Sequence, residues 1–124
     1  EIVPQAILAA EENARRNGVE NVEFHAAAAE KLLPQLVEKG LRPQVVVLDP
    51  PRKGCEEAVL AAIAQAAPER VVYVSCDPAT LARDAKFLCD HGFQALRCQS
   101  VDMFCQTGHV ETVCLFSKQK ANGD

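Results

Sequence analysis

Cys76 is the residue with the clearest chemical potential in this chain, because of the pattern around it. Four β-prone residues, 71–74, precede it, and Asp77 and Pro78 follow it as a typical N-cap and first helical residue. The thiol is therefore expected at the carboxyl end of a strand and beside the positive end of a helix dipole, which favours a nucleophilic thiolate. A buried cysteine that only fills space is the more common role for an isolated thiol. The neighbouring motifs are therefore needed to choose between these two roles for Cys76.

A rigid acidic turn, Asp49–Pro51, ends another apolar run. Pro51 keeps Pro50 out of helical geometry, and the two rings remove amide donors, so the turn is stiff and its carbonyl groups stay available. Such a turn can act as a fixed wall against which a planar or cationic group is held. An ordinary turn at the end of a strand is the alternative.

Glu111 is a candidate general base on the last predicted strand. Residues two apart share a face of a strand, so Glu111 shares its face with Val113 and Leu115. Apolar neighbours disfavour the charged form of a carboxylate, which suits a base. A charge that protects an edge strand from aggregation is the alternative. His109 could touch a substrate, although a polar residue at the start of a strand is the more usual role.

Helices and strands alternate along the chain. The apolar patterns and breakers predict helices over 4–17, 28–39, 56–67 and 78–90, and strands ending at residue 3 and covering 21–25, 44–48, 71–75, 93–101 and 109–116. This alternation predicts an α/β fold with a mostly parallel sheet that is covered on both faces and joined by right-handed crossovers. The last two strands have no helix between them, so we expect the final strand to be antiparallel. Ligands of such sheets lie at the carboxyl ends of the strands, where Glu1, the Asp49 turn and Cys76 are all expected.

The composition fits one domain with one core: 124 residues, of which 48% are hydrophobic and 24% charged. No apolar run is long enough to span a bilayer and no signal-peptide pattern occurs, which predicts a cytoplasmic protein. The formal net charge of −4 argues against RNA binding through overall charge alone. Neither a disulfide framework nor a metal site fits the cysteine spacing, which lacks Cys-x-x-Cys, so we expect free thiols. The cysteines are Cys55, Cys76, Cys89, Cys98, Cys105 and Cys114.

Three segments together resemble the catalytic domain of the RNA uracil-5-methyltransferases, the S-adenosylmethionine-dependent enzymes that make 5-methyluridine in tRNA or ribosomal RNA. The segments are Leu48–Gly54, Ser75–Asp84 and Asp102–Val113, and they occur in the family's order and spacing. The resemblance implies a Rossmann-like class I methyltransferase fold, S-adenosylmethionine as the cofactor and RNA as the partner. No metal site is expected within this chain, on the cysteine spacing given above.

The resemblance also implies roles for individual residues. Carbon 5 of uracil is a poor nucleophile, so the thiolate of Cys76 would first add to carbon 6. Carbon 5 would then accept the methyl group, and Glu111 would remove the carbon-5 proton so that the cysteine can leave. Asp49 and Glu1 would lie on the cofactor side, with Glu1 at the ribose. The substrate side would hold Pro50, Arg52, Arg83 and His109.

The family's first strand and its glycine-rich turn would precede Glu1, and this sequence does not contain them. We therefore expect residues 1–117 to be a partial catalytic domain from the C-terminal part of a larger enzyme, followed by a polar tail at 118–124. The missing strand would lie between the strands that end at Glu1 and Leu48. Its loss predicts an open edge, impaired activity and self-association.

Two other functions remain open. An amino-group methyltransferase could use the Asp49–Pro51 turn to orient its target, and it would need neither Cys76 nor Glu111. A non-catalytic RNA-binding or assembly module could keep the fold, and it would bind RNA in a salt-dependent way without a covalent intermediate. Both tRNA and ribosomal RNA are candidate targets.

Overall fold

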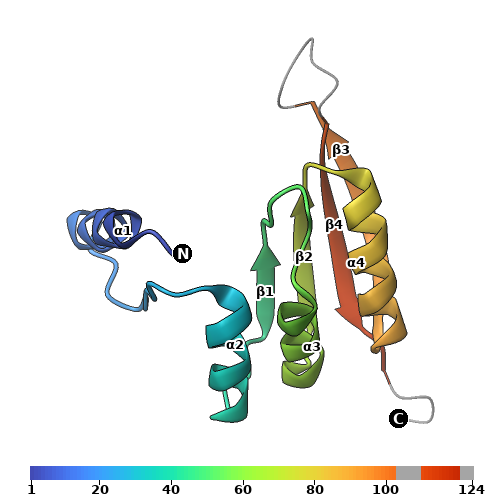
Figure 1. Cartoon of the computed structure of the whole chain (residues 1–124), viewed down its shortest axis with the longest axis horizontal. Helices are drawn as coiled ribbons and strands as arrows, with labels where there is room; N and C mark the ends of the chain where they lie inside the picture. The colour runs from blue at the N-terminus through green and yellow to red at the C-terminus, as the bar shows by residue number, and fades with distance from the viewer. Residues whose placement is uncertain (103–109, 121–124) are drawn as a thin grey trace.

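The computed structural model describes residues 1–102 and 110–120, and its centre is a four-stranded sheet (Figure 1). The strands are β1 (Val45–Leu48), β2 (Arg70–Ser75), β3 (Phe93–Val101) and β4 (Glu111–Lys118), and the helices are α1 (Pro4–Arg16), α2 (Ala29–Glu38), α3 (Glu57–Ala66) and α4 (Pro78–Asp90). The strand order is β1-β2-β4-β3. β1 and β2 are parallel, and β4 lies antiparallel between β2 and β3. The predicted α/β class and the antiparallel last strand are therefore confirmed.

The core lies between the sheet and one layer of helices. Every second residue of β2 is buried, including Val71 and Tyr73, because these side chains face α3 and α4. Phe93 of β3, Phe116 of β4 and Leu88 of α4 complete this cluster. These alternating apolar positions hold β2 and the helix that follows it in a fixed relation, and this relation positions the candidate site.

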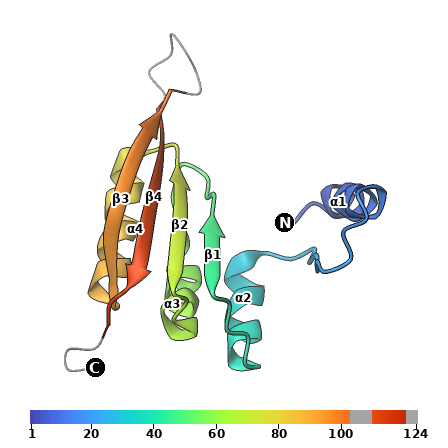
Figure 2. The same cartoon turned by 180° about the vertical axis from the view of Figure 1, so that it is seen from behind.

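Only one face of the sheet carries helices in the part of the chain that the structure describes. Figures 1 and 2 show α3 and α4 on the same face, while the opposite face is open to the viewer in Figure 2. α1 stands apart from the sheet and has no buried residue. The expectation of a sheet covered on both faces is therefore wrong for the described residues, because the sheet does not extend beneath α1.

The two N-terminal strands predicted from the sequence do not form. Residues 1–3 and 21–25 are irregular, although they meet at their ends. The Ala27 N–H donates to the Glu1 carbonyl at 2.9 Å, and the Glu1 backbone nitrogen lies 3.4 Å from the His25 carbonyl. Apolar pattern alone does not make a strand, since each strand needs a neighbour for its backbone groups, and an isolated pair is marginally stable.

The other predicted elements form close to their predicted bounds. α2 begins at Ala29 and continues through Pro34, so this proline neither delays the start of the helix nor ends it. β4 extends to Lys118, the first residue of the predicted tail, and residues 121–124 of that tail lie outside the described residues. None of the helices within residues 1–102 and 110–120 combines the length and apolarity that crossing a bilayer requires.

A disulfide joins Cys98 of β3 to Cys114 of β4, so the expectation that the cysteines are free is wrong for this pair. The two residues are direct partners in the antiparallel register, with Cα atoms 4.1 Å apart. Linear spacing did not reveal the pair, because it depends on how two strands align. Cys55, Cys76 and Cys89 are free, and Cys105 lies outside the described residues.

We expect reduction of this disulfide to lower the free energy of unfolding by about 3 kcal/mol, the size typical of a closed loop of this length. The reason is that the bond restricts the unfolded chain. The measurement is urea unfolding with and without reductant, together with peptide mapping under non-reducing conditions. Cys98→Ser should reproduce the effect of the reductant, whereas Cys89→Ser, at an exposed free thiol, should not. Six titratable thiols in the unreduced, unfolded chain would contradict the prediction.

Candidate active site

The turn between β2 and α4 holds Cys76 in place. The Ser75 hydroxyl donates to the Asp77 carbonyl at 2.8 Å and accepts the Asp77 N–H at 3.1 Å, which closes a tight turn around the cysteine. The Asp77 carboxylate accepts the N–H groups of Ala79 and Thr80, as predicted for the N-cap of α4. Cys76 is therefore a half-buried free thiol at the amino end of a helix.

Glu111 comes to the same edge of the sheet through the β2–β4 register. Ser75 pairs with Thr112, and the next position outward along each strand is Cys76 on one side and Glu111 on the other. Glu111 is half-buried and pairs with Val101 of β3 on its other side. A thiol and a carboxylate from neighbouring strands thus stand at one edge, which is the arrangement that nucleophilic attack followed by proton removal requires.

The loop that begins at Asp49 leaves the sheet at this edge as well. It follows Leu48, which pairs with Tyr73 of β2, and Figure 1 shows it beside the turn between β2 and α4. Asp49 is exposed and Pro50 is half-buried. The Thr80 hydroxyl donates to the Arg52 carbonyl at 2.8 Å, which ties the loop to α4.

The buried Asp84 and the more exposed Arg83 form a polar cluster between α4 and this loop. Asp84 is 1% exposed. Its Oδ2 accepts the Tyr73 hydroxyl at 2.6 Å and the Cys55 N–H at 2.8 Å, and its Oδ1 accepts Nε of Arg83 at 3.0 Å. Nη2 of Arg83 donates to the Lys53 carbonyl at 2.8 Å. The guanidinium predicted for the substrate side therefore binds carbonyl groups of the protein's own loop.

Sequence reasoning missed Asp84, Tyr73 and Thr80 as parts of this site. The periodicity of α4 contained a signal, because Asp84 precedes the buried Leu88 by one turn and so faces the core. A charged residue on the apolar side of a helix needs a partner. The neighbouring Arg83 does not give such a signal, because its side chain is 56% exposed and does not lie on the buried side of the helix.

Glu1 faces a groove between the N-terminal segment and β1. The groove has a volume of ≈ 610 Å³ and mostly apolar walls that include Ile7, Leu33, Val46 and Leu48. A hydrogen bond from the Val3 N–H to Oε1 of Glu1, 2.9 Å long, lowers the pKa of this carboxyl. An ionised carboxylate beside apolar walls suits a ligand with hydroxyl groups and a flat base. Asp49 follows a wall residue of this groove without lining it.

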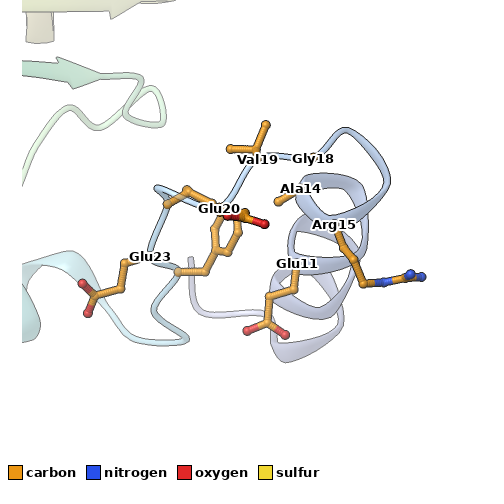
Figure 3. A pocket seen from close by; sticks show the side chains of 9 residues that line it. Glu11, Ala14, Arg15, Gly18, Val19, Glu20 and Glu23 are labelled. Atoms are coloured by element: carbon orange, nitrogen blue, oxygen red, sulfur yellow. The ribbon is translucent and has the colours of Figure 1, made fainter.

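A second hollow, of ≈ 490 Å³, lies beside α1 (Figure 3), and none of the residues that line it belongs to the sheet. Its lining includes three carboxylates, Glu11, Glu20 and Glu23, and Arg15, whose side chain extends outward in Figure 3. Carboxylates repel phosphate groups, so this hollow does not suit RNA. His109 lies outside the described residues, and no group of side chains within the described ranges has the composition of a metal site.

Comparison with known proteins agrees with the fold. Residues 1–119 match the model of the tRNA (uracil-5-)-methyltransferase family. The chain is 53% identical to an uncharacterized RNA methyltransferase of Clostridium acetobutylicum, covering 95% of this chain and 26% of that protein. A relative from Geobacter sulfurreducens is 51% identical, covering 100% of this chain and 25% of that protein. The chain thus spans about a quarter of the length of these relatives.

Solved structures agree with the same relationship. The tRNA (uracil-54, C5)-methyltransferase of Pyrococcus abyssi, in complex with S-adenosyl-L-homocysteine, is 31% identical, with a TM-score of 0.78 over 94% of this chain and 27% of that one. The precorrin-6y C5,15-methyltransferase of Geobacter metallireducens, 19% identical with a TM-score of 0.72 over 96% of this chain and 65% of that one, shows the likeness of fold alone. The predicted Rossmann-like methyltransferase fold is confirmed, and the chain belongs to the tRNA (uracil-5-)-methyltransferase family.

Proposed function

We propose that this chain is part of an enzyme that acts in the cytoplasm and transfers a methyl group from S-adenosylmethionine to carbon 5 of a uridine in tRNA or ribosomal RNA, through a covalent bond between Cys76 and uracil carbon 6. The β2–β4 register supports this most strongly, because Glu111 occupies the position next to Cys76 at the edge of the sheet. Family membership supports it independently.

The reaction divides between the two side chains. The Cys76 thiolate attacks carbon 6, and the electron pair of the carbon 5–carbon 6 double bond moves onto carbon 5 and the carbonyl at position 4. Bound S-adenosylmethionine would supply the methyl group from its sulfonium sulfur, carbon 5 would accept it, and S-adenosylhomocysteine would leave with the electron pair of the broken carbon–sulfur bond. The Glu111 carboxylate then takes the carbon-5 proton, the double bond re-forms, and Cys76 leaves with its electron pair. The result is 5-methyluridine and a regenerated thiolate.

We assign Glu1 and Asp49 to the cofactor side. Glu1 would accept a hydrogen bond from a ribose hydroxyl, and the hydrogen bond from the Val3 N–H that lowers the pKa of its carboxyl also favours the ionised, accepting form. The apolar groove beside Glu1 fits the adenosine part of the cofactor in size and polarity. Asp49, at the end of β1, would lie between the cofactor and the base. On the substrate side we assign Pro50, Arg52 and His109, with Pro50 as the wall for the uracil ring.

The intact protein tests this function directly. Unmethylated tRNA and ribosomal RNA are incubated with S-adenosylmethionine, digested to nucleosides and analysed by mass spectrometry. We expect 5-methyluridine in one of the two RNAs. A nucleoside methylated on an exocyclic amino group would instead support an amino-group methyltransferase. Salt-dependent RNA binding without any methylated nucleoside would support a non-catalytic module.

We expect the 124-residue chain by itself to self-associate and to methylate poorly. Within the described residues β1 pairs only with β2, and Val45 and Val47 on this strand are 53% and 67% exposed. An open apolar edge pairs readily with a second copy. Sedimentation velocity measures the association, and Val47→Lys should weaken it. A monomer at all accessible concentrations would contradict the expectation.

A further inference from the structure

We propose that Arg83 and Asp84 are positioning residues that hold the loop of residues 49–55 at a fixed place relative to Cys76. The inference rests on the proposed function, since it explains what fixes the distance between Pro50, the wall of the uracil site, and the nucleophile Cys76. It gives Arg83 a role other than direct contact with the substrate.

Helix α4 connects the two parts of the site. Its amino end is capped by Asp77, the residue next to Cys76. One turn further on, the Thr80 hydroxyl holds the Arg52 carbonyl, and the next turn brings Arg83 to the carbonyl groups of the loop. The nucleophile and the loop are therefore attached to a single helix, which behaves as a rigid spacer between them.

Asp84 ties a third element, β2, into the same arrangement. Tyr73, which donates to Asp84, lies on the strand that ends just before Cys76 and is fully buried. Burial, with the nearby Asp84 as the next cause, raises the pKa of the Cys55 thiol to about 11, and burial likewise raises the pKa of the Tyr73 hydroxyl. Both groups stay protonated near neutral pH. The Tyr73 hydroxyl therefore remains a donor to the buried carboxylate under all ordinary conditions.

Gly54 shows how closely the loop approaches the pair. Its φ of +79° is in the left-handed region, and a Cβ atom on it would lie 2.5 Å from Nη2 of Arg83 and 2.6 Å from Oδ2 of Asp84. A side chain at this position would push the loop away from α4. The backbone of the loop is therefore seated directly on the two side chains.

Placement of this kind affects the rate of reaction more than binding. A displacement of reacting groups by about 1 Å can reduce the rate by a factor of about 10². We therefore expect Arg83→Gln and Asp84→Asn to lower kcat by about ten- to a hundredfold, with less than a threefold change in KM for RNA. Arg83→Lys should recover part of kcat, because an ammonium group can still reach one of the carbonyl oxygens.

The experiment uses the intact protein and includes a readout that does not depend on activity. Alkylation of Cys55 by iodoacetamide at pH 8, followed at the peptide level, reports whether the loop still holds this thiol in its half-buried position. We expect it to rise about tenfold in Arg83→Gln, because release of the loop exposes the half-buried thiol, and this outweighs the loss of the guanidinium charge, which lowers the pKa of the thiol. Lys86→Gln, which removes an exposed ion pair with Asp90 on the same helix, is the control and should change neither readout.

Two results would overturn the proposal. A higher KM for RNA with unchanged kcat in Arg83→Gln would show a direct RNA contact, and unchanged Cys55 alkylation would show that the loop does not depend on the pair. Circular dichroism at the assay temperature separates these effects from unfolding. If Asp84→Asn fails to fold, the exposed Arg83 variants decide the question. Failure of the proposed function appears separately, as an absence of 5-methyluridine in the unaltered protein, and leaves the alkylation result valid.

Discussion

In the intact protein, Cys76→Ala is expected to abolish the covalent complex with RNA that carries 5-fluorouridine at the target position, and to lower methyl transfer to ordinary RNA by roughly 10³-fold or more. The fluorine atom cannot leave carbon 5 as a proton does, so the methylated adduct on the cysteine is trapped. An alanine at this position leaves the Ser75–Asp77 turn intact, since the two hydrogen bonds of that turn do not involve the thiol. The loss would therefore report the chemistry of the sulfur atom.

Cys89→Ala is the matched control, because Cys89 is an exposed free thiol further along α4. It should form the trapped complex at the normal rate. The complex is measured on a denaturing gel, and mass spectrometry of the peptide that contains Cys76 identifies the bond. If Cys76→Ala still methylates RNA, the nucleophile assignment is wrong and the amino-group methyltransferase becomes the better interpretation.

Glu111→Gln should separate the two halves of the reaction. The amide has the shape of the carboxylate and keeps the position in β4, yet it cannot accept the carbon-5 proton. Loss of a positioned general base costs about 10²- to 10⁴-fold in rate. We therefore expect kcat to fall by this factor, while methylated RNA stays bound to Cys76 even when the RNA contains ordinary uridine.

The measurement is the amount of covalent protein–RNA complex after a single turnover, together with the rate at which 5-methyluridine is released. Glu57→Gln, at an exposed position in the first turn of α3, is the control and should release product normally. Normal release from Glu111→Gln would assign the base to another group. Failure of the variant to form any complex would place Glu111 before the methyl transfer.

Local sequence signals predicted most of the fold because they concern neighbouring residues. The strand over 93–101 and the helix from Pro78 to Asp90 form with the predicted bounds, since their caps and apolar periods lie within the segments themselves. The strand predicted over 21–25 does not form, because its stability depends on a partner strand that no local pattern can supply. The prediction that helices cover both faces of the sheet is wrong for the described residues for the same reason, because it also depended on strands that need a partner.

The candidate site also contains some features that local sequence predicts and others that it does not. The position of Cys76 at the end of β2 was predicted from the strand and helix signals around it, and the place of Glu111, one residue beyond the Ser75–Thr112 pair, follows from the antiparallel last strand. The Cys98–Cys114 disulfide was missed because it depends on strand register. Asp84 was missed because charged residues on helices are usually exposed, and only three-dimensional packing reveals its donors.

The cross-strand disulfide affects the register of β3 and β4 as well as the stability of the fold. In a strand pair, a shift of one residue would turn every side chain of β4 to the opposite face, and Glu111 would then point away from its present side. β3 is irregular between Ala95 and Arg97, the kind of place at which such shifts begin. The covalent bond lies between this irregularity and the Val101–Glu111 pair. The bond therefore holds the register of β3 and β4. The oxidation state of Cys98 and Cys114 decides how firmly the orientation of the Glu111 carboxylate, three residues from Cys114, is specified.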